Sequence, residues 1–327
     1  MTRVLISPTT LAGVQASFVD VLKAEGFELV YHGRPGQLNE EQILETLKGI
    51  DATLAGSEPY NERVLAAHPQ LKVIARVGVG YDAVDCAAAT RHGVVVSTTP
   101  NTNQGAVAEH TFAMMLALTK NIVSQHIGTR EGRWPRGSNI PMRWRTMGIT
   151  GLGRIGKATA TRAKAFEMKV IAYDPFPDTA WAAANDVELV SLDELFRESD
   201  FLTLHMPALP ETAKMVNATM LALMKPTAYL INTSRGAVID EADLYEALKA
   251  KRIAGAGLDV FAVEPPGNSP LLTLDNVVLT PHAAGVDLQS RDDMARSAAD
   301  AIVSLSRGEW PTEKVVNPEV KKTFRWK

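Results

Sequence analysis

The sequence predicts an α/β protein built of two doubly wound units, each with a parallel sheet. Short apolar runs alternate with amphipathic segments along most of the chain, and the alternation stops once and then starts again. Apolar runs separated by helices of about ten residues favour right-handed crossover connections, which place successive strands parallel in one sheet. The 327 residues are enough for about two domains of roughly 150 residues each.

The first series of apolar runs occupies the first third of the chain. Its predicted strands are Val4–Ser7, Phe27–Tyr31, Ala52–Ala55, Val73–Val77 and Val94–Ser97. Amphipathic stretches such as Glu40–Lys48 and Asn61–Ala67 lie between these runs and are predicted helices. A long helical segment, predicted to run from Ala106 to about Glu131, ends the series.

The second series is longer and predicts the larger unit. Its predicted strands are Met147–Thr150, Val170–Tyr173, Phe201–Leu204, Ala228–Asn232, Ala254–Asp259 and Val277–Thr280. A helix from Lys157 to about Phe166 follows the first of these strands, and an amphipathic helix over roughly Gln289–Ser306 follows the last.

Composition excludes several classes of partner. The formal net charge of −3 gives no electrostatic footprint for nucleic acid or an anionic membrane. The only cysteine, Cys86, excludes an intrachain disulfide framework and fits a reducing compartment. The most apolar stretch, Phe112–Leu118, is too short to cross a bilayer. We therefore expect a cytoplasmic protein that acts on a small molecule, and no histidine spacing predicts a metal site.

A loop over residues 133–144 combines two tryptophans with proline, glycine and arginine. A surface loop rarely leaves two such rings in water, so one interpretation is a contact between subunits. The alternative is that Trp134 and Trp144 fold back onto their own domain.

A glycine motif predicts a dinucleotide site. Gly151, Gly153 and Gly156 follow the strand that ends at Thr150, and they open the next helix. The first glycine permits a tight turn, the second lets the backbone approach a pyrophosphate, and the third lets the helix pack closely on the strand. The helix N-terminus then faces the phosphate charge.

The residue that follows the next strand predicts which dinucleotide binds. Asp174 stands eighteen residues beyond Gly156, where a carboxylate accepts hydrogen bonds from the adenosine ribose hydroxyls. The residues that come next are Pro175, Phe176 and Pro177, and no arginine or lysine is among them. A 2′-phosphate would meet a negative charge without a cation, so the sequence favours NAD over NADP.

Reactive residue types follow three later strands of the second series. Arg235, Glu264 and His282 each stand just beyond a predicted strand, at the edge where an open parallel sheet forms its ligand crevice. An arginine fork grips a carboxylate through two hydrogen bonds, and a histidine supplies or removes a proton near neutral pH. A glutamate beside that histidine stabilises the imidazolium. These three groups predict hydride transfer to or from a small 2-hydroxy or 2-keto acid.

With these residues in place, the chain resembles the D-isomer-specific 2-hydroxyacid dehydrogenase family, and within it the phosphoglycerate dehydrogenases. The segments that carry the resemblance are Arg76–Asp85, Val107–Thr111, Gly151–Gly156, Asn232–Asp240, Gly257–Pro266 and Pro281–Gly285. They extend from about residue 70 to residue 290 and are highly specific together.

The resemblance implies roles for individual residues. It makes Arg235, Glu264 and His282 the catalytic residues of an oxidoreductase. It also places further residues at contacts with NAD, beside the three glycines of the motif: Arg154, Ile155, Asp174, Met206, Thr233, Asp259 and Gly285. The implied substrate contacts are Val77, Gly78, Val79 and Arg235. His110 and His205 match family positions too, and we interpret both as packing or polar support.

The resemblance also implies an architecture. A Rossmann coenzyme domain over residues 101–286 is expected beside a discontinuous, flavodoxin-like substrate domain over residues 1–100 and 287–327. A homodimer built around the coenzyme domains is implied as well.

Two departures from the family pattern leave the substrate open. Glu58 stands in the region where some phosphoglycerate dehydrogenases place a phosphate-binding arginine, and Val79 replaces a frequent threonine. Phosphoglycerate or phosphohydroxypyruvate and glyoxylate or hydroxypyruvate therefore remain as candidates. Arg136 could serve a phosphate across a dimer, although a solvated charge is the favoured interpretation.

Three other functions are compatible with parts of this pattern. An NAD(H)-sensing, corepressor-like binding protein can keep the same catalytic residues and so stays open. Formate dehydrogenases share the architecture but pair glutamine with histidine, so Glu264 argues against them. Adenosylhomocysteinase fits the architecture but not the order of the three catalytic residues.

Overall fold

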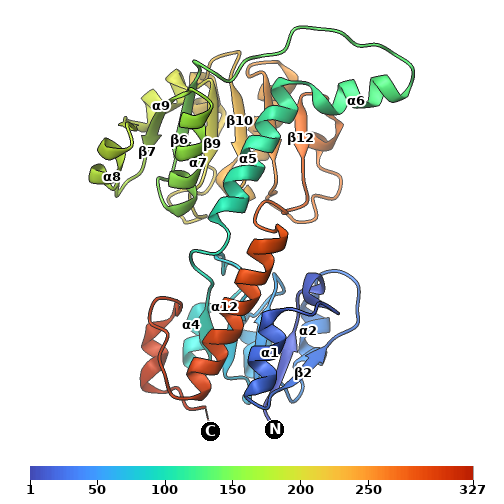
Figure 1. Ribbon diagram of the computed structural model, residues 1–327, viewed down its shortest axis with the longest axis vertical. Helices are drawn as coiled ribbons and strands as arrows, with labels where there is room; N and C mark the ends of the chain where they lie inside the picture. The colour runs from blue at the N-terminus through green and yellow to red at the C-terminus, as the bar shows by residue number, and fades with distance from the viewer. Residues whose placement is uncertain (327) are drawn as a thin grey trace. The chain divides into compact units, whose positions relative to one another are not determined.

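The computed structural model describes residues 1–326, and the chain divides into two compact units (Figure 1). Unit 1 comprises Met1–Asn103 and Asp287–Lys327, and unit 2 comprises Gln104–Val286. Each unit has its own parallel sheet, as the sequence predicted. Among residues 1–326 no helix is long and apolar enough to cross a membrane.

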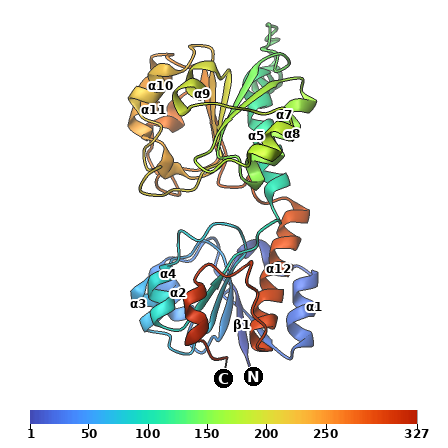
Figure 2. The same cartoon turned by 90° about the vertical axis from the view of Figure 1, so that its left-hand side faces the viewer.

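Unit 1 is a five-stranded sheet with the order β2-β1-β3-β4-β5, the flavodoxin-like order. Its strands are β1 (Arg3–Ile6), β2 (Glu28–Tyr31), β3 (Ala52–Ala55), β4 (Val73–Arg76) and β5 (Val95–Ser97). Its helices are α1 (Ser17–Ala24), α2 (Glu40–Thr46), α3 (Glu62–Ala66), α4 (Cys86–Arg91) and α12 (Leu288–Ser306). Helices α1 and α12 cover one face of this sheet, and α2, α3 and α4 cover the other (Figure 2).

Unit 2 is a seven-stranded sheet with the order β12-β11-β10-β9-β6-β7-β8. Its strands are β6 (Thr146–Thr150), β7 (Lys169–Tyr173), β8 (Glu188–Leu189), β9 (Phe201–Leu204), β10 (Tyr229–Asn232), β11 (Gly255–Leu258) and β12 (Val277–Leu279). The chain leaves β6 toward β7 on one side and later returns to β9 on the other side. This reversal of strand order is the place where doubly wound sheets bind ligands.

Two sets of helices cover the unit 2 sheet. Helices α5 (Gln104–Thr119), α7 (Arg154–Ala165) and α8 (Thr179–Ala184) lie on one face (Figure 2). Helices α9 (Leu192–Glu198), α10 (Ala218–Leu223) and α11 (Glu241–Lys249) lie on the other. Both faces of the central strands are therefore buried, which explains why those strands read as continuous apolar runs.

Local sequence accounts for where most helices begin. The side chains of Asn39, Asn61 and Asp85 accept hydrogen bonds from backbone N–H groups in the first turns of α2, α3 and α4. Asp287 does the same for α12. Short polar side chains at this position satisfy N–H groups that have no partner inside the helix.

The predicted single helical segment over Ala106–Glu131 is wrong. Helix α5 ends at Thr119, and a separate helix, α6 (Ile122–Arg130), begins after two intervening residues. Asn121 between them has a φ of +50°, in the left-handed region that interrupts a right-handed helix and that asparagine tolerates well.

The tryptophans of the loop over residues 133–144 do not fold back onto unit 2. Trp134 and Trp144 are each 76% exposed, so that alternative is wrong for this chain. Trp144 has a φ of +65°, and the guanidinium of Arg143 lies 4.9 Å from the centre of its ring. Figure 1 shows α6 and the following loop extending beyond the helices that cover the sheet.

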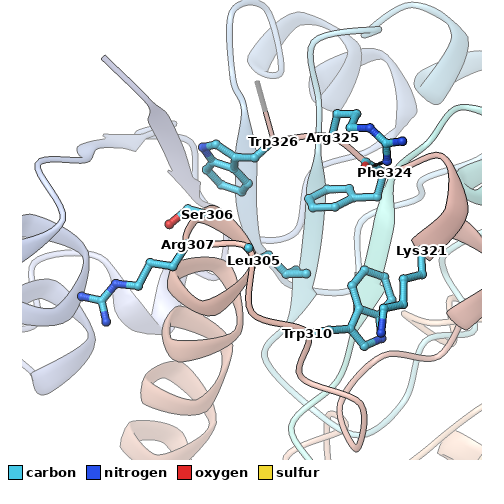
Figure 3. Close-up of a pocket in the computed structure, with 9 residues that line it drawn as sticks. Leu305, Ser306, Arg307, Trp310, Lys321, Phe324, Arg325 and Trp326 are labelled. Carbon is cyan, nitrogen blue, oxygen red and sulfur yellow. Dashed lines mark hydrogen bonds between the residues drawn. The ribbon is translucent and has the colours of Figure 1, made fainter.

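The C-terminal segment of unit 1 packs beside the end of α12. Figure 3 shows Trp310, Phe324 and Trp326 around a hollow of about 520 Å³ at this place. The ring of Trp326 stacks on Phe27 with 6.0 Å between ring centres, and Lys321 places its ammonium 5.4 Å from the centre of the Trp310 ring. These aromatic contacts anchor the segment to the core of unit 1.

Candidate active site

The glycine motif lies at the reversal of strand order in unit 2. Gly151 has a φ of +85°, and a Cβ there would lie 2.7 Å from the carbonyl oxygen of His205. A Cβ at Gly156 would lie 2.1 Å from the carbonyl oxygen of Gly151, which explains the glycine at that position. Nothing lies within 4 Å of the place where a Cβ at Gly153 would stand.

Helix α7 begins directly after this open glycine. Gly153 is its N-cap residue and provides no side-chain hydrogen bond, so the first N–H groups of α7 have no capping side chain. The first turn also carries no acidic residue. An open backbone cradle at a helix N-terminus suits a pyrophosphate, and the dinucleotide therefore fits the residues present. Arg154 and Ile155 form the start of this helix, which begins three residues before the predicted start at Lys157.

Asp174 follows β7 and braces the glycine loop. One carboxylate oxygen accepts a hydrogen bond from the N–H of Leu152 at 2.8 Å, and the other accepts from the N–H of Phe176 at 2.8 Å. Each carboxylate oxygen keeps a second lone pair, so the group can still accept from ribose hydroxyls.

His205, after β9, lies next to the glycine loop and contacts α7 and β9. Its Nε2 lies 3.1 Å from the hydroxyls of both Thr159 and Thr203. Burial lowers the pKa of His205 to about 3, so this imidazole is neutral across the physiological range. This imidazole is therefore unsuited to proton transfer near neutral pH. Met206, the next residue and a predicted NAD contact, is buried.

The loop after β10 is pinned by Asn232. The side-chain oxygen of this buried residue accepts from the N–H and the hydroxyl of Ser234, at 3.0 Å and 2.8 Å. Its amide donates to the carbonyl of Arg235 at 2.9 Å. The next residue, Gly236, passes so close to the following loop that a Cβ there would lie 1.9 Å from the carbonyl carbon of Phe261. This close approach brings the loop that bears Arg235 to the loop that bears Glu264.

Glu264 and His282 form a hydrogen-bonded pair. The Nδ1 atom of His282 lies 2.7 Å from Oε2 of Glu264, and the two side chains are 45% and 37% exposed. The other carboxylate oxygen of Glu264 accepts from the N–H of Phe261 at 3.1 Å. Partial burial acts to raise the pKa of Glu264, but the hydrogen bond and charge of His282, the N–H of Phe261 and the charge of Arg235 together lower it.

Asp259 holds the turn that carries His282. This fully buried carboxylate accepts from the N–H groups of Ala283 and Ala284, at 2.8 Å and 2.9 Å, and from the hydroxyl of Thr280 at 2.6 Å. His282 itself has a φ of +54°, and its N–H donates to the carbonyl of Asp259 at 2.8 Å. A histidine in the left-handed region stays there only when its surroundings fix it.

Most of the predicted site residues lie at the carboxyl ends of the unit 2 strands. The three predicted catalytic residues lie on the loops after β10, β11 and β12, and Thr233, Asp259 and Gly285 lie on those same loops. Val77, Gly78 and Val79 follow β4 and belong to unit 1. Within residues 1–326 no group of three or more His, Cys, Asp or Glu side chains could hold a metal ion.

Several residues that shape the site were not singled out from the sequence. Glu241, at the start of α11, accepts from the N–H of Ala262 at 2.6 Å and so steadies the loop of Glu264. Asn232 and Thr280 pin the two neighbouring loops. Among these, Asn232 had a recognisable signal, because an asparagine at the end of a strand favours an Asx turn with the backbone two residues on.

Comparison with known proteins identifies the family of the chain. An open glycine cradle at a helix N-terminus, followed by three loops that carry an arginine, a glutamate and a histidine, defines a dinucleotide-dependent oxidoreductase class. Residues 112–284 match the family model of the D-isomer specific 2-hydroxyacid dehydrogenase, NAD binding domain. The chain belongs to this family, and the predictions of family, fold class and NAD as cofactor are confirmed.

Individual relatives are similar over nearly the whole chain. A D-3-phosphoglycerate dehydrogenase from Synechocystis is 41% identical over 320 residues, which are 97% of this chain and 56% of the relative. A glyoxylate reductase from Korarchaeum cryptofilum is 40% identical over 306 residues, 91% of this chain and 92% of the relative. The chain thus spans little more than half the length of the phosphoglycerate dehydrogenase, but nearly all of the glyoxylate reductase.

A solved structure shows the same arrangement of elements. D-lactate dehydrogenase from Aquifex aeolicus, complexed with NAD and lactic acid, superposes with a TM-score of 0.84 and 28% identity. The superposition covers 97% of this chain and 99% of that structure's chain.

Proposed function

We propose that this chain is an NAD-dependent oxidoreductase that interconverts a small 2-keto acid and the corresponding D-2-hydroxy acid. The observation that carries the proposal is the 2.7 Å contact between Nδ1 of His282 and Glu264, on strand-end loops of the unit that bears the glycine cradle. NAD, when bound, supplies or accepts the hydride. The chain's own residues must then bind the acid and handle one proton.

His282 is the proton donor and acceptor. Glu264 occupies Nδ1, and within residues 1–326 no other group is bound to Nε2, so Nε2 is the atom left to face a substrate oxygen. In keto-acid reduction Nε2–H gives its proton to the carbonyl oxygen, and in the reverse direction Nε2 takes the hydroxyl proton. The Glu264 carboxylate stabilises the imidazolium that donates the proton or results from taking it.

Arg235 fixes the substrate carboxylate. Its guanidinium provides the planar pair of donors that match a carboxylate, and one of its nitrogens also donates to the carbonyl of Ser234 at 2.7 Å. The charge of Arg235 reaches Glu264 as well, since it helps to lower the pKa of that carboxyl group. Arg235 therefore interacts electrostatically with the acid–base pair, through Glu264.

Unit 1, over residues 1–100 and 287–327, is the proposed substrate domain, with Val77, Gly78 and Val79 as substrate contacts. Its charge pattern favours an unphosphorylated acid such as glyoxylate or hydroxypyruvate. Glu58 follows β3, is 2% exposed, and is fixed by hydrogen bonds from the N–H of Gly56 at 3.0 Å and the hydroxyl of Tyr60 at 2.8 Å. A fixed carboxylate at the carboxyl edge of this sheet disfavours a phosphate.

The test is a spectrophotometric screen of NADH oxidation with glyoxylate, hydroxypyruvate, phosphohydroxypyruvate and pyruvate. We expect turnover with glyoxylate or hydroxypyruvate that exceeds turnover with phosphohydroxypyruvate, and loss of turnover in His282→Asn. NADH binding without consumption of any of these acids would instead support an NAD(H)-sensing binding protein. A preference for phosphohydroxypyruvate would overturn the role given to Glu58.

A homodimer is part of the proposal. Ile122, Val123 and Ile127 of α6 are about half exposed, and Trp134 and Trp144 on the following loop are each 76% exposed. Large apolar side chains exposed on successive segments favour an interface. Analytical ultracentrifugation should give twice the mass of the chain, and Trp134→Ser should lower the affinity of the two subunits for each other.

A cytoplasmic location is also part of the proposal, because the single cysteine, Cys86, fits a reducing compartment.

A further inference from the structure

Helix α5 contacts the strand-end loops of unit 2 through two consecutive residues. His110 places its Nε2 atom 3.0 Å from the hydroxyl oxygen of Thr280, after β12. Thr111 places its hydroxyl 3.3 Å from that of Thr233, after β10. The same helix packs against β10, β11 and β12 beneath these loops. It is therefore placed to fix loops that are far apart in the sequence.

The direction of the hydrogen bonds at Thr280 follows from its single hydroxyl proton. The carboxylate of Asp259 can only accept, so the 2.6 Å contact requires Thr280 to donate its proton there. Thr280 must then accept from His110, whose Nε2 carries a proton. The chain of donors thus runs from His110 to Thr280 to Asp259, and the Nε2 atom of His110 also lies 3.7 Å from Oδ1 of Asp259, beyond hydrogen-bond distance.

Asp259 ends this chain by holding the turn of His282. Its oxygens accept the N–H groups of Ala283 and Ala284, which directly follow His282, while the Asp259 carbonyl accepts the N–H of His282 itself. The φ of +54° at His282 is costly for a histidine, so the orientation of its imidazole depends on these contacts.

We propose that His110 and Thr280 are positioning residues that hold His282 in its working orientation through Asp259. The proposal rests on the proposed function, in which His282 transfers the proton. His110 does not touch the substrate or the reacting atoms in this scheme. It acts through hydrogen bonds that keep Asp259 fixed, and a proton-transfer group displaced by about 1 Å can lose about 10²-fold in rate.

Thr280→Val removes the hydroxyl while nearly preserving side-chain shape, and Thr280→Ser keeps the hydroxyl. We expect Thr280→Val to lower kcat about 10- to 100-fold, with melting temperature and NADH affinity close to those of the unaltered protein. Thr280→Ser should restore most of the rate. The matched control is Thr119→Val at the end of the same helix, because the buried hydroxyl of Thr119 donates to the carbonyl of Met115 within the helix. It should leave kcat unchanged.

A double-mutant cycle separates one relay from two independent contacts. His110→Phe should lower kcat in the same way as Thr280→Val, and the double variant should be no slower than the slower single variant. Losses that multiply, or a kcat within twofold of the unaltered protein for either single variant, would overturn the proposal. A loss of rate matched by a loss of thermal stability that Thr280→Ser does not rescue would overturn it too.

A measurement without turnover keeps this inference distinct from the proposed function. In NMR spectra of the cofactor-free protein, the amide signals of Ala283 and Ala284 should shift in Thr280→Val and return in Thr280→Ser. Signals that stay in place would refute the relay whatever the reaction is. If the unaltered protein turns over no 2-keto acid while these signals do shift, the proposed function fails and the part played by Thr280 in holding the turn stands.

Discussion

Each sheet has one buried acidic side chain beside the carboxyl ends of its strands, but the two side chains accept hydrogen bonds from different kinds of partner. Asp259, after β11, accepts hydrogen bonds from the loop after the neighbouring strand β12. Within residues 1–326, the hydrogen bonds to the carboxylate of Glu58, after β3, come from Gly56 and Tyr60 on its own loop. In unit 2 a single carboxylate thus joins two strand-end loops, whereas in unit 1 the carboxylate of Glu58 joins groups within its own loop. Loops that are joined by hydrogen bonds give the fixed geometry that proton transfer needs.

The largest expected effect comes from removing the imidazole of His282, which the strand-end loops of unit 2 hold in place. His282→Asn deletes the acid–base while leaving the side chain of Asp259 with its donors. We expect kcat to fall by about 10²–10⁴, the usual loss for a general acid–base, with NADH affinity nearly unchanged. Steady-state kinetics and NADH fluorescence titration measure the two quantities. Near-normal turnover, with chemistry shown to limit the rate, would remove His282 from the mechanism.

The comparison itself is tested by a matched pair of amide substitutions. Asp259→Asn cannot accept at both oxygens, so the turn of His282 should loosen and kcat should fall by about 10²-fold. Glu58→Gln breaks a network confined to one loop, so we expect mainly a lower free energy of unfolding, by about 1–3 kcal/mol. Urea denaturation and kcat for both variants give the answer. Equal losses of kcat would show that the two carboxylates play equivalent parts.

The fold could be predicted further than the site could. The glycine motif and the apolar runs located β6, the glycine loop and the strand ends, because both depend on neighbours in sequence. The break between α5 and α6 was missed, since Asn121 in a left-handed conformation leaves no glycine or proline to mark it. The contact between His110 and Thr280 joins residues 170 positions apart, and no local pattern encodes it.

A smaller effect is expected at Asp174, the predicted contact with the adenosine ribose. Asp174 should repel a 2′-phosphate, so we expect NAD to be preferred over NADP by at least about tenfold in kcat/KM, or 1.4 kcal/mol. Asp174→Ala removes the charge and should narrow this preference. Because Asp174 also accepts from Leu152, the affinity for NADH should weaken at the same time. Equal kcat/KM values for the two coenzymes in the unaltered protein would contradict the assignment.

The smallest expected effect is a displacement along the pH axis, and it tests whether Glu264 tunes His282 or merely contacts it. The pKa of Glu264 is lowered in the folded protein, so the group is an anion throughout the range in which an imidazole titrates. In reduction His282 must start protonated, and activity falls as pH rises. In oxidation it must start neutral, and activity falls as pH drops. Removing the anion destabilises the imidazolium, so both limbs should move toward lower pH in Glu264→Gln.

Because both side chains are more than a third exposed, solvent screens the pair and the displacement should be about one pH unit or less. The measurement is kcat/KM against pH in both directions for the unaltered protein and Glu264→Gln, with chemistry limiting in each case. The cofactor preference serves as a control, since Glu264→Gln should leave the ratio of NAD to NADP unchanged. Limbs that stay in place, or that move in opposite directions, would show that the carboxylate positions the imidazole without changing its protonation.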